Sequence, residues 1–154
     1  SAPAREKMAY ASLLSGICLA QTGLGAVHGL ASPLGAFFPI PHGAACGTLV
    51  ATATAVNIAA MGRRDPENPA LPKYAEIGRR FAMQKGLNAR DARSFLVTSL
   101  RQWEQALALP RLSNWRITGA DLPRIVANCR GSSMKTNPVV LTDEEITQIL
   151  AARL

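Results

Sequence analysis

Charged residues are absent from a long stretch of this sequence: no Asp, Glu, Lys or Arg occurs from Met8 to Gly62. An uncharged stretch of this length first suggests a membrane span, and Gly43–Gly62 is long enough to cross a bilayer. Its content argues otherwise, since it is mostly Ala, Thr and Gly, with Asn57 and only a few large aliphatic residues. Helices buried on all sides in a globular protein have the same composition. We therefore predict a central buried helix and no membrane contact.

Cysteine is also scarce. Cys18, Cys46 and Cys129 make an odd number, and none belongs to a CxxC pair. This usage is typical of a reducing compartment, and it argues against a disulfide framework or a cysteine-based zinc site. No secretory signal is visible, because the charged start Ser1–Lys7 is not followed by a short apolar core with a cleavage signature. We expect a cytoplasmic protein, and the missing initial Met suggests a fragment or a processed product.

Aromatic residues make up 5% of the chain, and β-branched runs are too short to demand a sheet. The 154 residues are 48% hydrophobic and 18% charged, which is enough apolar material for one globular domain with a substantial core. Because Ala and Leu are abundant, the sequence predicts an all-α domain of about seven helices.

The net charge of +7 and the pI of about 10.0 raise the question of nucleic-acid binding. The basic residues are dispersed, however, and the densest pair, Arg63-Arg64, is followed at once by Asp65 and Glu67. Aromatic residues interleaved with basic ones, which stack on bases, are missing. We predict no nucleic-acid partner. A solvated basic surface, or a face that complements an acidic partner domain, fits this charge distribution better.

Helix periodicity and capping signals predict the element boundaries. Apolar stripes are expected in three helices: Leu13, Leu14, Ile17 and Cys18; Tyr74, Ile77 and Phe81; Phe95, Leu96, Leu100, Trp103 and Leu107. The five residues of the last set are expected to form the buried face of their helix. The expected helices are Pro3–Ala20, Ala26–Ala31, Gly43–Met61, one from Pro72 ended by Gly86, one capped by Asn88 and ended by Pro110, and two that open at the capping boxes Thr118–Asp121 and Thr142–Glu145. Between them, Ser32–Pro41 is expected to be a turn and Gly131–Pro138 a loop.

The two histidines of the protein, His28 and His42, lie fourteen residues apart within Gly23–Leu49. On one continuous helix they would be separated by roughly 21 Å. That is too far to share a metal ion, whose bonds to imidazole nitrogen are about 2.0–2.1 Å. Prolines at positions 33, 39 and 41 argue against a continuous helix. A chain that folds back at this turn can bring the two rings together.

Two interpretations of this pair remain open. In the simpler one, each imidazole bonds a helix end or a buried carbonyl, which satisfies a polar ring in an uncharged region. In the other, the rings bind Zn²⁺ or Fe²⁺, which suits imidazole ligands. Two neutral ligands seldom suffice, and Met8–Gly62 contains no carboxylate, so further ligands would have to come from elsewhere. Cys46 is interpreted as a small core residue and not as a nucleophile, since its only basic neighbour is His42.

The stretch GLGAVHGLASPLGAFFPIPHGAACGTL resembles the signature of the iron-containing (group III) alcohol dehydrogenases. Two motifs carry the likeness, GxVHG around His28 and IPHG around His42, at the separation seen in that family. The resemblance extends to AREKMAYASLLSGICLAQTGLG, KYAEIGRRFA, LPRLSNWRITGADLPRIVANC and NPVVLTDEEITQIL, and so covers nearly the whole chain.

The resemblance implies a two-domain enzyme in which an N-terminal α/β domain binds NAD(P) and a C-terminal helical domain binds the metal. In the family an Asp and three His hold iron, or sometimes zinc. Two of those His correspond to His28 and His42, while the other ligands precede Ser1. Residues 1–154 would thus be the C-terminal metal-binding domain without its N-terminal cofactor domain. The reaction implied is interconversion of an alcohol and an aldehyde or ketone by hydride transfer.

The resemblance also suggests a substrate pocket. Ser32 stands where many relatives have a further His, and Phe37 and Phe38 are expected to line the substrate side, with core packing left open as their alternative role. No residue is assigned as a catalytic group or cofactor contact. The chain alone is expected to lack activity and to bind iron weakly or not at all. In the whole enzyme its expected partners are its own N-terminal domain and a small alcohol or aldehyde, and assembly with a second copy of the chain is left open. The alternative is a helical interaction or nucleic-acid-binding domain without chemistry, whose two imidazoles would point apart.

Overall fold

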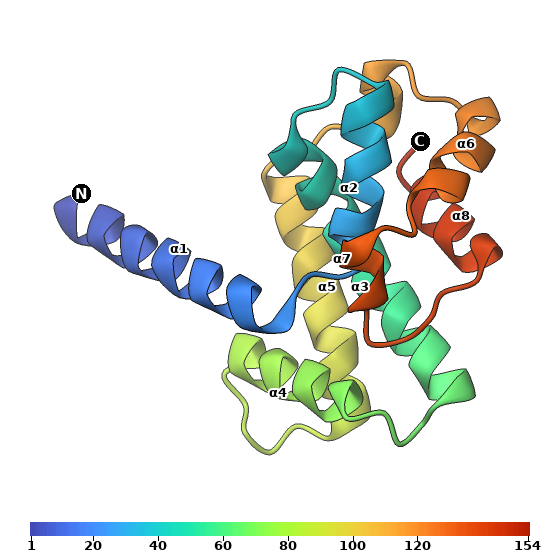
Figure 1. Ribbon diagram of the computed structural model, residues 1–154. Helices are drawn as coiled ribbons and strands as arrows, with labels where there is room; N and C mark the ends of the chain where they lie inside the picture. Colours follow the sequence, from blue (N-terminus) through green and yellow to red (C-terminus); the bar gives the residue numbers. More distant parts are fainter.

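The computed structural model describes all residues 1–154, and it contains helices and no strand (Figure 1). This confirms the predicted all-α class. The elements are α1 (Ala2–Thr22), α2 (Ala26–Phe37), α3 (His42–Arg64), α4 (Ala70–Ala82), α5 (Ala89–Ala106), the 3₁₀ turns η1 (Leu112–Trp115) and η2 (Gly119–Asp121), α6 (Leu122–Asn128), α7 (Ser132–Lys135) and α8 (Asp143–Ala151). There are eight α-helices where about seven were expected. The additional one is α7, a single turn within the predicted loop Gly131–Pro138.

Helix α3 lies at the centre of the fold and packs against α2, α4, α5 and α8. Its buried positions are small or medium-sized, as in Ala45, Leu49, Ala53, Val56 and Ala60. Small side chains allow neighbouring helices to approach closely. By length and composition, α3 is the single helix that could cross a membrane by itself, yet half of its apolar window is buried inside the fold. That position agrees with the predicted central core helix.

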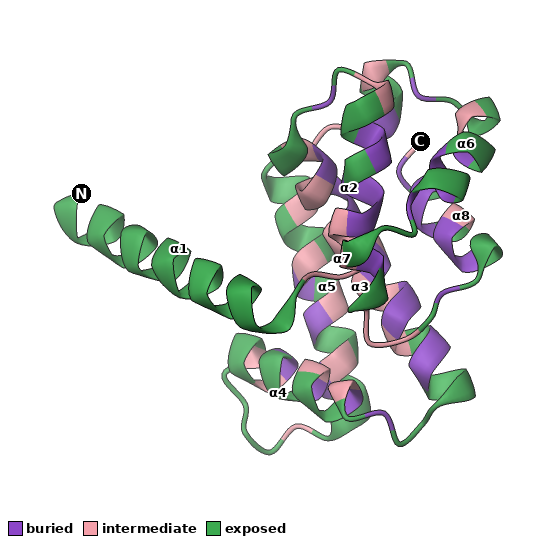
Figure 2. Cartoon of the chain, viewed as in Figure 1, coloured by how far each residue is buried: buried purple, intermediate pink, exposed green.

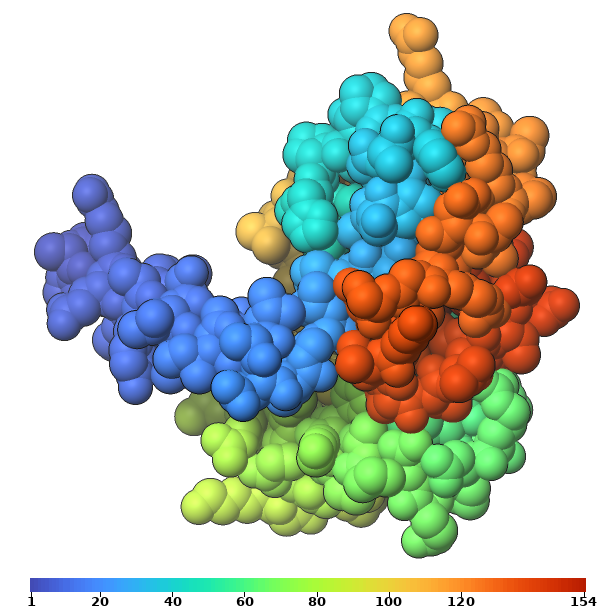
Figure 3. All heavy atoms as spheres, in the orientation of Figure 1, coloured from blue at the N-terminus to red at the C-terminus, as the bar shows by residue number.

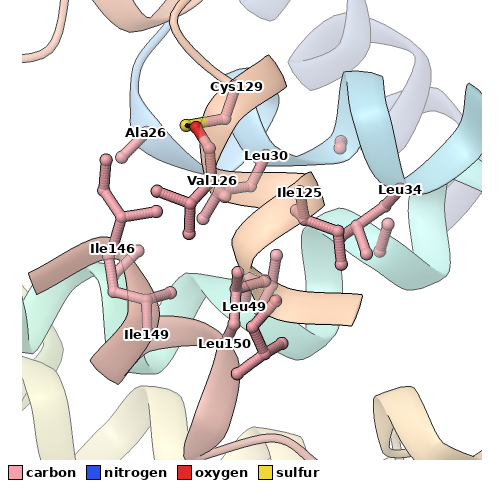
Figure 4. Close-up of a cluster of buried hydrophobic side chains, with 14 of the residues drawn as sticks. Ala26, Leu30, Leu34, Leu49, Ile125, Val126, Cys129, Ile146, Ile149 and Leu150 are labelled. Atoms are coloured by element: carbon pink, nitrogen blue, oxygen red, sulfur yellow. Dashed lines mark hydrogen bonds between the residues drawn. The ribbon is translucent and has the colours of Figure 1, made fainter. Parts of the chain in front are cut away.

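The hydrophobic core joins α2 and α3 to the C-terminal helices (Figures 2 and 4). Leu30 and Leu34 of α2 meet Leu49 of α3 and large aliphatic side chains of α6 and α8. Burying each such side chain contributes about 1.5–3 kcal/mol. The fully buried aliphatic residues of the C-terminal segments are Leu112, Ile117, Ile125, Leu141, Ile146, Ile149 and Leu150. Residues far apart in the sequence thus fix the position of α2, which carries His28.

The predicted end of α2 was wrong, because the helix continues through Pro33 to Phe37. A proline inside a helix removes one backbone hydrogen bond and costs about 3 kcal/mol. Leu30 and Leu34, on either side of Pro33, are completely buried, and Pro33 is buried as well. Their burial offsets the cost of the proline. The connection to α3 therefore shortens from the predicted Ser32–Pro41 to residues 38–41.

Several other boundaries also differ from the prediction. Gly62 remains helical, and α3 extends to Arg64. Helix α4 begins before Pro72, which occupies its first turn, where a missing N–H costs little. The same helix ends at Met83, which adopts a left-handed conformation with φ of 54°, and not at Gly86. These shifts are small and leave the order of elements intact.

The predicted capping signals are present. The side chain of Asn88 accepts a hydrogen bond from the N–H of Asp91 at 2.9 Å. In the Thr142 capping box, the Glu145 N–H donates to the threonine hydroxyl at 3.2 Å, and the Thr142 N–H donates to the glutamate carboxylate at 3.0 Å. Thr118 forms the corresponding box with Asp121, which opens η2. Local hydrogen bonding therefore fixes these three starts, as the sequence indicates.

The apolar stripe of α1 does not pack against this chain. No residue of α1 is buried, and Leu13 and Ile17 are 61% and 52% exposed. Figures 1 and 3 show α1 extending away from the remaining helices. The predicted helix is therefore present, but its apolar stripe has no partner among the other helices of this chain.

The stripes of α4 and α5 are only partly covered. These helices contact each other closely through small residues, with Gly78 of α4 against Ala92 of α5. The large side chains are displaced to the edge, where the rings of Phe81 and Trp103 lie 4.9 Å apart, centre to centre, and Trp103 is half exposed. Leu107 is largely exposed as well. The prediction that all five apolar residues of α5 form a buried face was correct only for Leu96.

A buried carboxylate links α8 to the end of α3. Glu145 is 7% exposed and accepts hydrogen bonds from Arg63 at 2.8 Å and from Arg64 at 2.5 Å. The hydrogen bond from Arg64 is the largest influence on its pKa, which falls to about 2, with further contributions from the Thr142 N–H and Arg63. The ionised form of Glu145 is therefore favoured in the folded protein.

Replacing Glu145 by Gln is expected to lower the free energy of unfolding by about 2–3 kcal/mol at pH 7. Gln keeps the capping bond to Thr142 but removes the charge that the two arginines share. Because the folded-state pKa lies below the unfolded value of 4.5, the stabilisation is complete above that value and is lost as the pH falls toward 2. Urea denaturation at several pH values measures the difference. Glu144→Gln, on the exposed side of the same turn, is the control; equal effects of the two substitutions would contradict the assignment.

Candidate metal centre

The segment between α2 and α3 brings the two histidines together. His28 lies in the first turn of α2, and His42 is the first residue of α3. The start of α2 is held by Asn137, whose side-chain oxygen accepts a hydrogen bond from the Ala26 N–H at 3.0 Å. Asn137 is in turn hydrogen-bonded to the side chain of Asn57, a buried residue of α3. This amide pair ties both helices to the loop before α8.

The imidazole rings of His28 and His42 lie 5.2 Å apart, centre to centre, with a tilt of 55° between their planes. His28 is half-buried and His42 is exposed, so the pair lies at the surface of this chain. Burial lowers the pKa of His28, and the neighbouring His42 lowers it further. Both effects favour the neutral form of His28, which is the form in which imidazole binds a metal.

One further potential ligand lies beside the two rings. Cys46 follows His42 by one helical turn, and its Sγ is 3.5 Å from His42 Nε2. The potential ligand atoms of His28, His42 and Cys46 all lie within 4.8 Å of one another. No carboxylate belongs to this group. Two imidazoles and a thiol fit part of a coordination shell for Fe²⁺ or Zn²⁺.

The interpretation of Cys46 as a small core residue was incomplete. It is half-buried and packs against the core, but its sulfur also contacts the His42 ring. Burial raises the pKa of its thiol. The i, i+4 spacing from His42 was the signal for this contact, because residues four apart share one helix face.

Ser32 lies one turn after His28 on α2, and both residues line the same small cavity of about 80 Å³. The opposite wall comes from the end of α6 and the start of α7, where Asn128, Ser132 and Ser133 contribute polar groups. The cavity has space for two or three water molecules. It thus places hydroxyl and amide groups next to one of the predicted metal ligands.

Phe37 and Phe38 do not line this cavity. Both are half-buried and pack against the main core. The guanidinium of Arg124 lies over the Phe37 ring, 3.9 Å from its centre, in a cation–π contact. Within this chain their visible role is packing at the end of α2, and their place on the substrate side remains a prediction.

The sequence matches known proteins along its whole length. A sequence profile of the "Fe-containing alcohol dehydrogenase family, C-terminal" matches residues 1–154. The 1,3-propanediol dehydrogenase of Citrobacter freundii is 30% identical over 149 residues, which are 95% of this chain and 36% of that protein. The lactaldehyde reductase of Escherichia coli (strain K12) is 28% identical over 153 residues, covering 95% of this chain and 37% of that protein.

Solved structures share the fold. A crystal structure of 1,3-propanediol oxidoreductase superposes with a TM-score of 0.85 and 28% identity, covering 99% of this chain and 38% of that one. The alcohol dehydrogenase from Oenococcus oeni gives a TM-score of 0.82 at 28% identity, with the same coverage. The chain thus spans a little over a third of the length of these relatives. It belongs to the Fe-containing alcohol dehydrogenase family and corresponds to the C-terminal helical part of its enzymes.

Proposed function

We propose that this chain is the metal-binding, substrate-side domain of an alcohol dehydrogenase that interconverts an alcohol and an aldehyde or ketone with NAD(P). The observation that carries the proposal is the convergence of His28 and His42 across the turn between α2 and α3. If each imidazole only formed a hydrogen bond at its own helix end, nothing would require the two rings to lie next to each other. The remaining ligands and the nucleotide would come from an N-terminal domain of the same protein, as in the family that the sequence resembles.

In this proposal His28 and His42 hold one divalent ion, Fe²⁺ or Zn²⁺, through neutral ring nitrogens. When bound, the ion supplies Lewis-acid polarisation of the alcohol or carbonyl oxygen while hydride moves to or from the nicotinamide. The half-burial of His28 favours its neutral form and limits the motion of its ring. The exposure of His42 leaves the other side of the site open to ligands from the second domain.

The cavity next to His28 is proposed to receive the polar end of a small substrate. Ser32 lines it and offers a hydroxyl that both donates and accepts hydrogen bonds. A hydroxyl can orient a substrate oxygen or pass a proton, but it does not titrate near neutral pH as imidazole does. Ser32 would therefore act mainly by orienting the substrate. Phe37 and Phe38 are proposed to approach the substrate only after the second domain completes the pocket.

A second candidate function is helical interaction without chemistry, and the exposed apolar side of α1 is the observation that favours it. In the dehydrogenase proposal the same surface contacts another part of the enzyme or a second copy of the chain. We propose no nucleic-acid or membrane partner, because the basic residues are dispersed along the chain and the apolar helix α3 is built into the core. We also propose that the protein is cytoplasmic, because its use of cysteine is typical of a reducing compartment.

Metal analysis and a dehydrogenase assay test this proposal on two forms of the protein. The chain of residues 1–154 alone is expected to bind iron weakly and to oxidise no alcohol, because the remaining ligands and the nucleotide site would come from the N-terminal domain. Joined to a cofactor domain of the family, it is expected to retain about one metal ion and to oxidise short-chain alcohols with NAD(P). Stoichiometric iron binding together with turnover in residues 1–154 alone would overturn the prediction that an N-terminal domain supplies the other ligands and the nucleotide site. A metal-free, inactive joined protein would overturn the dehydrogenase function itself.

A further inference from the structure

Core packing explains only part of the position of the Cys46 thiol. Ala45 and Leu49, its neighbours on α3, are completely buried, whereas Cys46 is half-buried and its sulfur lies beside an exposed imidazole. A residue that only filled space would be expected among the apolar side chains of α2 and α6. We propose that Cys46 is a third protein ligand of the metal site formed by His28 and His42. This inference rests on the proposed function, because it concerns the same ion.

The observed spacing fits joint coordination by His42 and Cys46. Bonds of about 2.0–2.1 Å to imidazole nitrogen and about 2.3 Å to thiolate sulfur, at a tetrahedral angle, place the two ligand atoms roughly 3.6 Å apart. The distance from Cys46 Sγ to His42 Nε2 is 3.5 Å. One ion can therefore bind both atoms without a change in the backbone of α3.

His28 completes the group from the neighbouring helix. Its ligand atom lies within 4.8 Å of those of His42 and Cys46. Two imidazoles on one ion are separated by roughly 3.3 Å at the tetrahedral angle, so closing the site requires a side-chain movement of at most about 1.5 Å. Staggered rotamers and small ring rotations allow such a shift. Three ligands then come from two helices that the fold already holds together.

The donor set determines which metal this site prefers. Thiolate is a soft ligand that suits Zn²⁺, whereas a site of imidazole and carboxylate also suits Fe²⁺. On binding, the Cys46 thiol loses its proton to solvent, and a sulfur–zinc bond forms with no change in oxidation state. Cys46 therefore shifts the selectivity of the site toward Zn²⁺.

The other two cysteines provide internal controls. Cys18 is exposed on α1, which has no buried residue. Cys129 is fully buried, and its sulfur is 3.2 Å from the Val126 carbonyl oxygen, to which it donates a hydrogen bond. Neither belongs to the group of potential ligands around the histidines. A metal-dependent signal from sulfur can thus be assigned to a single residue.

The test uses Co²⁺ as a spectroscopic substitute for Zn²⁺ in the chain of residues 1–154. Bound cobalt is expected to give the near-ultraviolet charge-transfer band of a thiolate ligand. Cys46→Ser should abolish the band and weaken Zn²⁺ binding at least about tenfold, which corresponds to 1.4 kcal/mol. Cys18→Ser should change neither. Zn²⁺ should also protect Cys46 from alkylation by iodoacetamide, whereas Cys18 should react equally with and without the metal.

The outcomes separate this inference from the proposed function. Cobalt that binds in a His28- and His42-dependent manner, without a charge-transfer band, would overturn the role of Cys46 and leave the histidine site standing. A band that survives Cys46→Ser would also overturn it. Failure of Co²⁺ and Zn²⁺ to bind at all, in residues 1–154 and in the protein joined to its cofactor domain, would overturn both the histidine site and the third ligand.

Discussion

His28→Ala and His42→Ala are each expected to remove the metal from the protein that carries both domains, leaving a content near zero after dialysis. Each substitution deletes one of the ligands that the turn between α2 and α3 brings to a common point. An ion that loses one imidazole is held by fewer bonds, and no carboxylate of this chain is close enough to replace it. Dehydrogenase activity should be lost together with the metal.

The measurement is metal content by elemental analysis, combined with thermal unfolding to show that each variant is folded. His42 is exposed, so its replacement should leave the fold almost unchanged. Gly35→Ala is a suitable control, since Gly35 is an exposed residue of α2 and an added Cβ would meet no atom within 4 Å. A folded variant of either histidine that retains a full complement of metal would refute the ligand assignment.

Gly78→Ala is expected to cause the largest loss of stability of any Gly→Ala substitution in this chain. A Cβ built at Gly78 would lie 1.9 Å from the Ala92 carbonyl oxygen and 2.6 Å from its carbonyl carbon, which belong to the backbone of α5. Backbone atoms cannot rotate away, so α4 and α5 would have to separate along their contact. We expect the free energy of unfolding to fall by about 3 kcal/mol or more.

Chemical denaturation compares this variant with Gly62→Ala. Gly62 is an exposed, helical residue of α3, and no atom lies within 4 Å of the position of its added Cβ. There the substitution should raise stability by about 0.8–1 kcal/mol, because Ala is a better helix former than Gly. Equal stability of the two variants would contradict the close contact between α4 and α5 at Gly78.

The sequence was a reliable guide where local chemistry determines structure. Asn88 and the box from Thr142 to Glu145 fix helix starts through hydrogen bonds between residues three apart, so their geometry is contained in a few adjacent residues. The separation of His28 and His42 around a proline-rich turn likewise indicated that the chain folds back. The helix starts could therefore be predicted from local hydrogen bonding, and the proximity of the two rings from the proline-rich turn.

The sequence was a poor guide where the outcome depends on distant contacts. Pro33 remains in α2 because Leu30 and Leu34 are buried against α6 and α8, which lie about a hundred residues away in the chain. The stripe containing Leu13 has the pattern of a buried face, yet no element of this chain covers it. Periodicity shows that a face is apolar, but it does not show which partner covers that face.

The central claim is that His28 and His42 bind one ion together. Anomalous diffraction at the metal absorption edge, on crystals of the metal-loaded protein with its cofactor domain, tests it most directly. We expect one strong peak between α2 and α3, within bonding distance of a ring nitrogen of both histidines. A peak that contacts neither ring, or only one of them, would contradict the account.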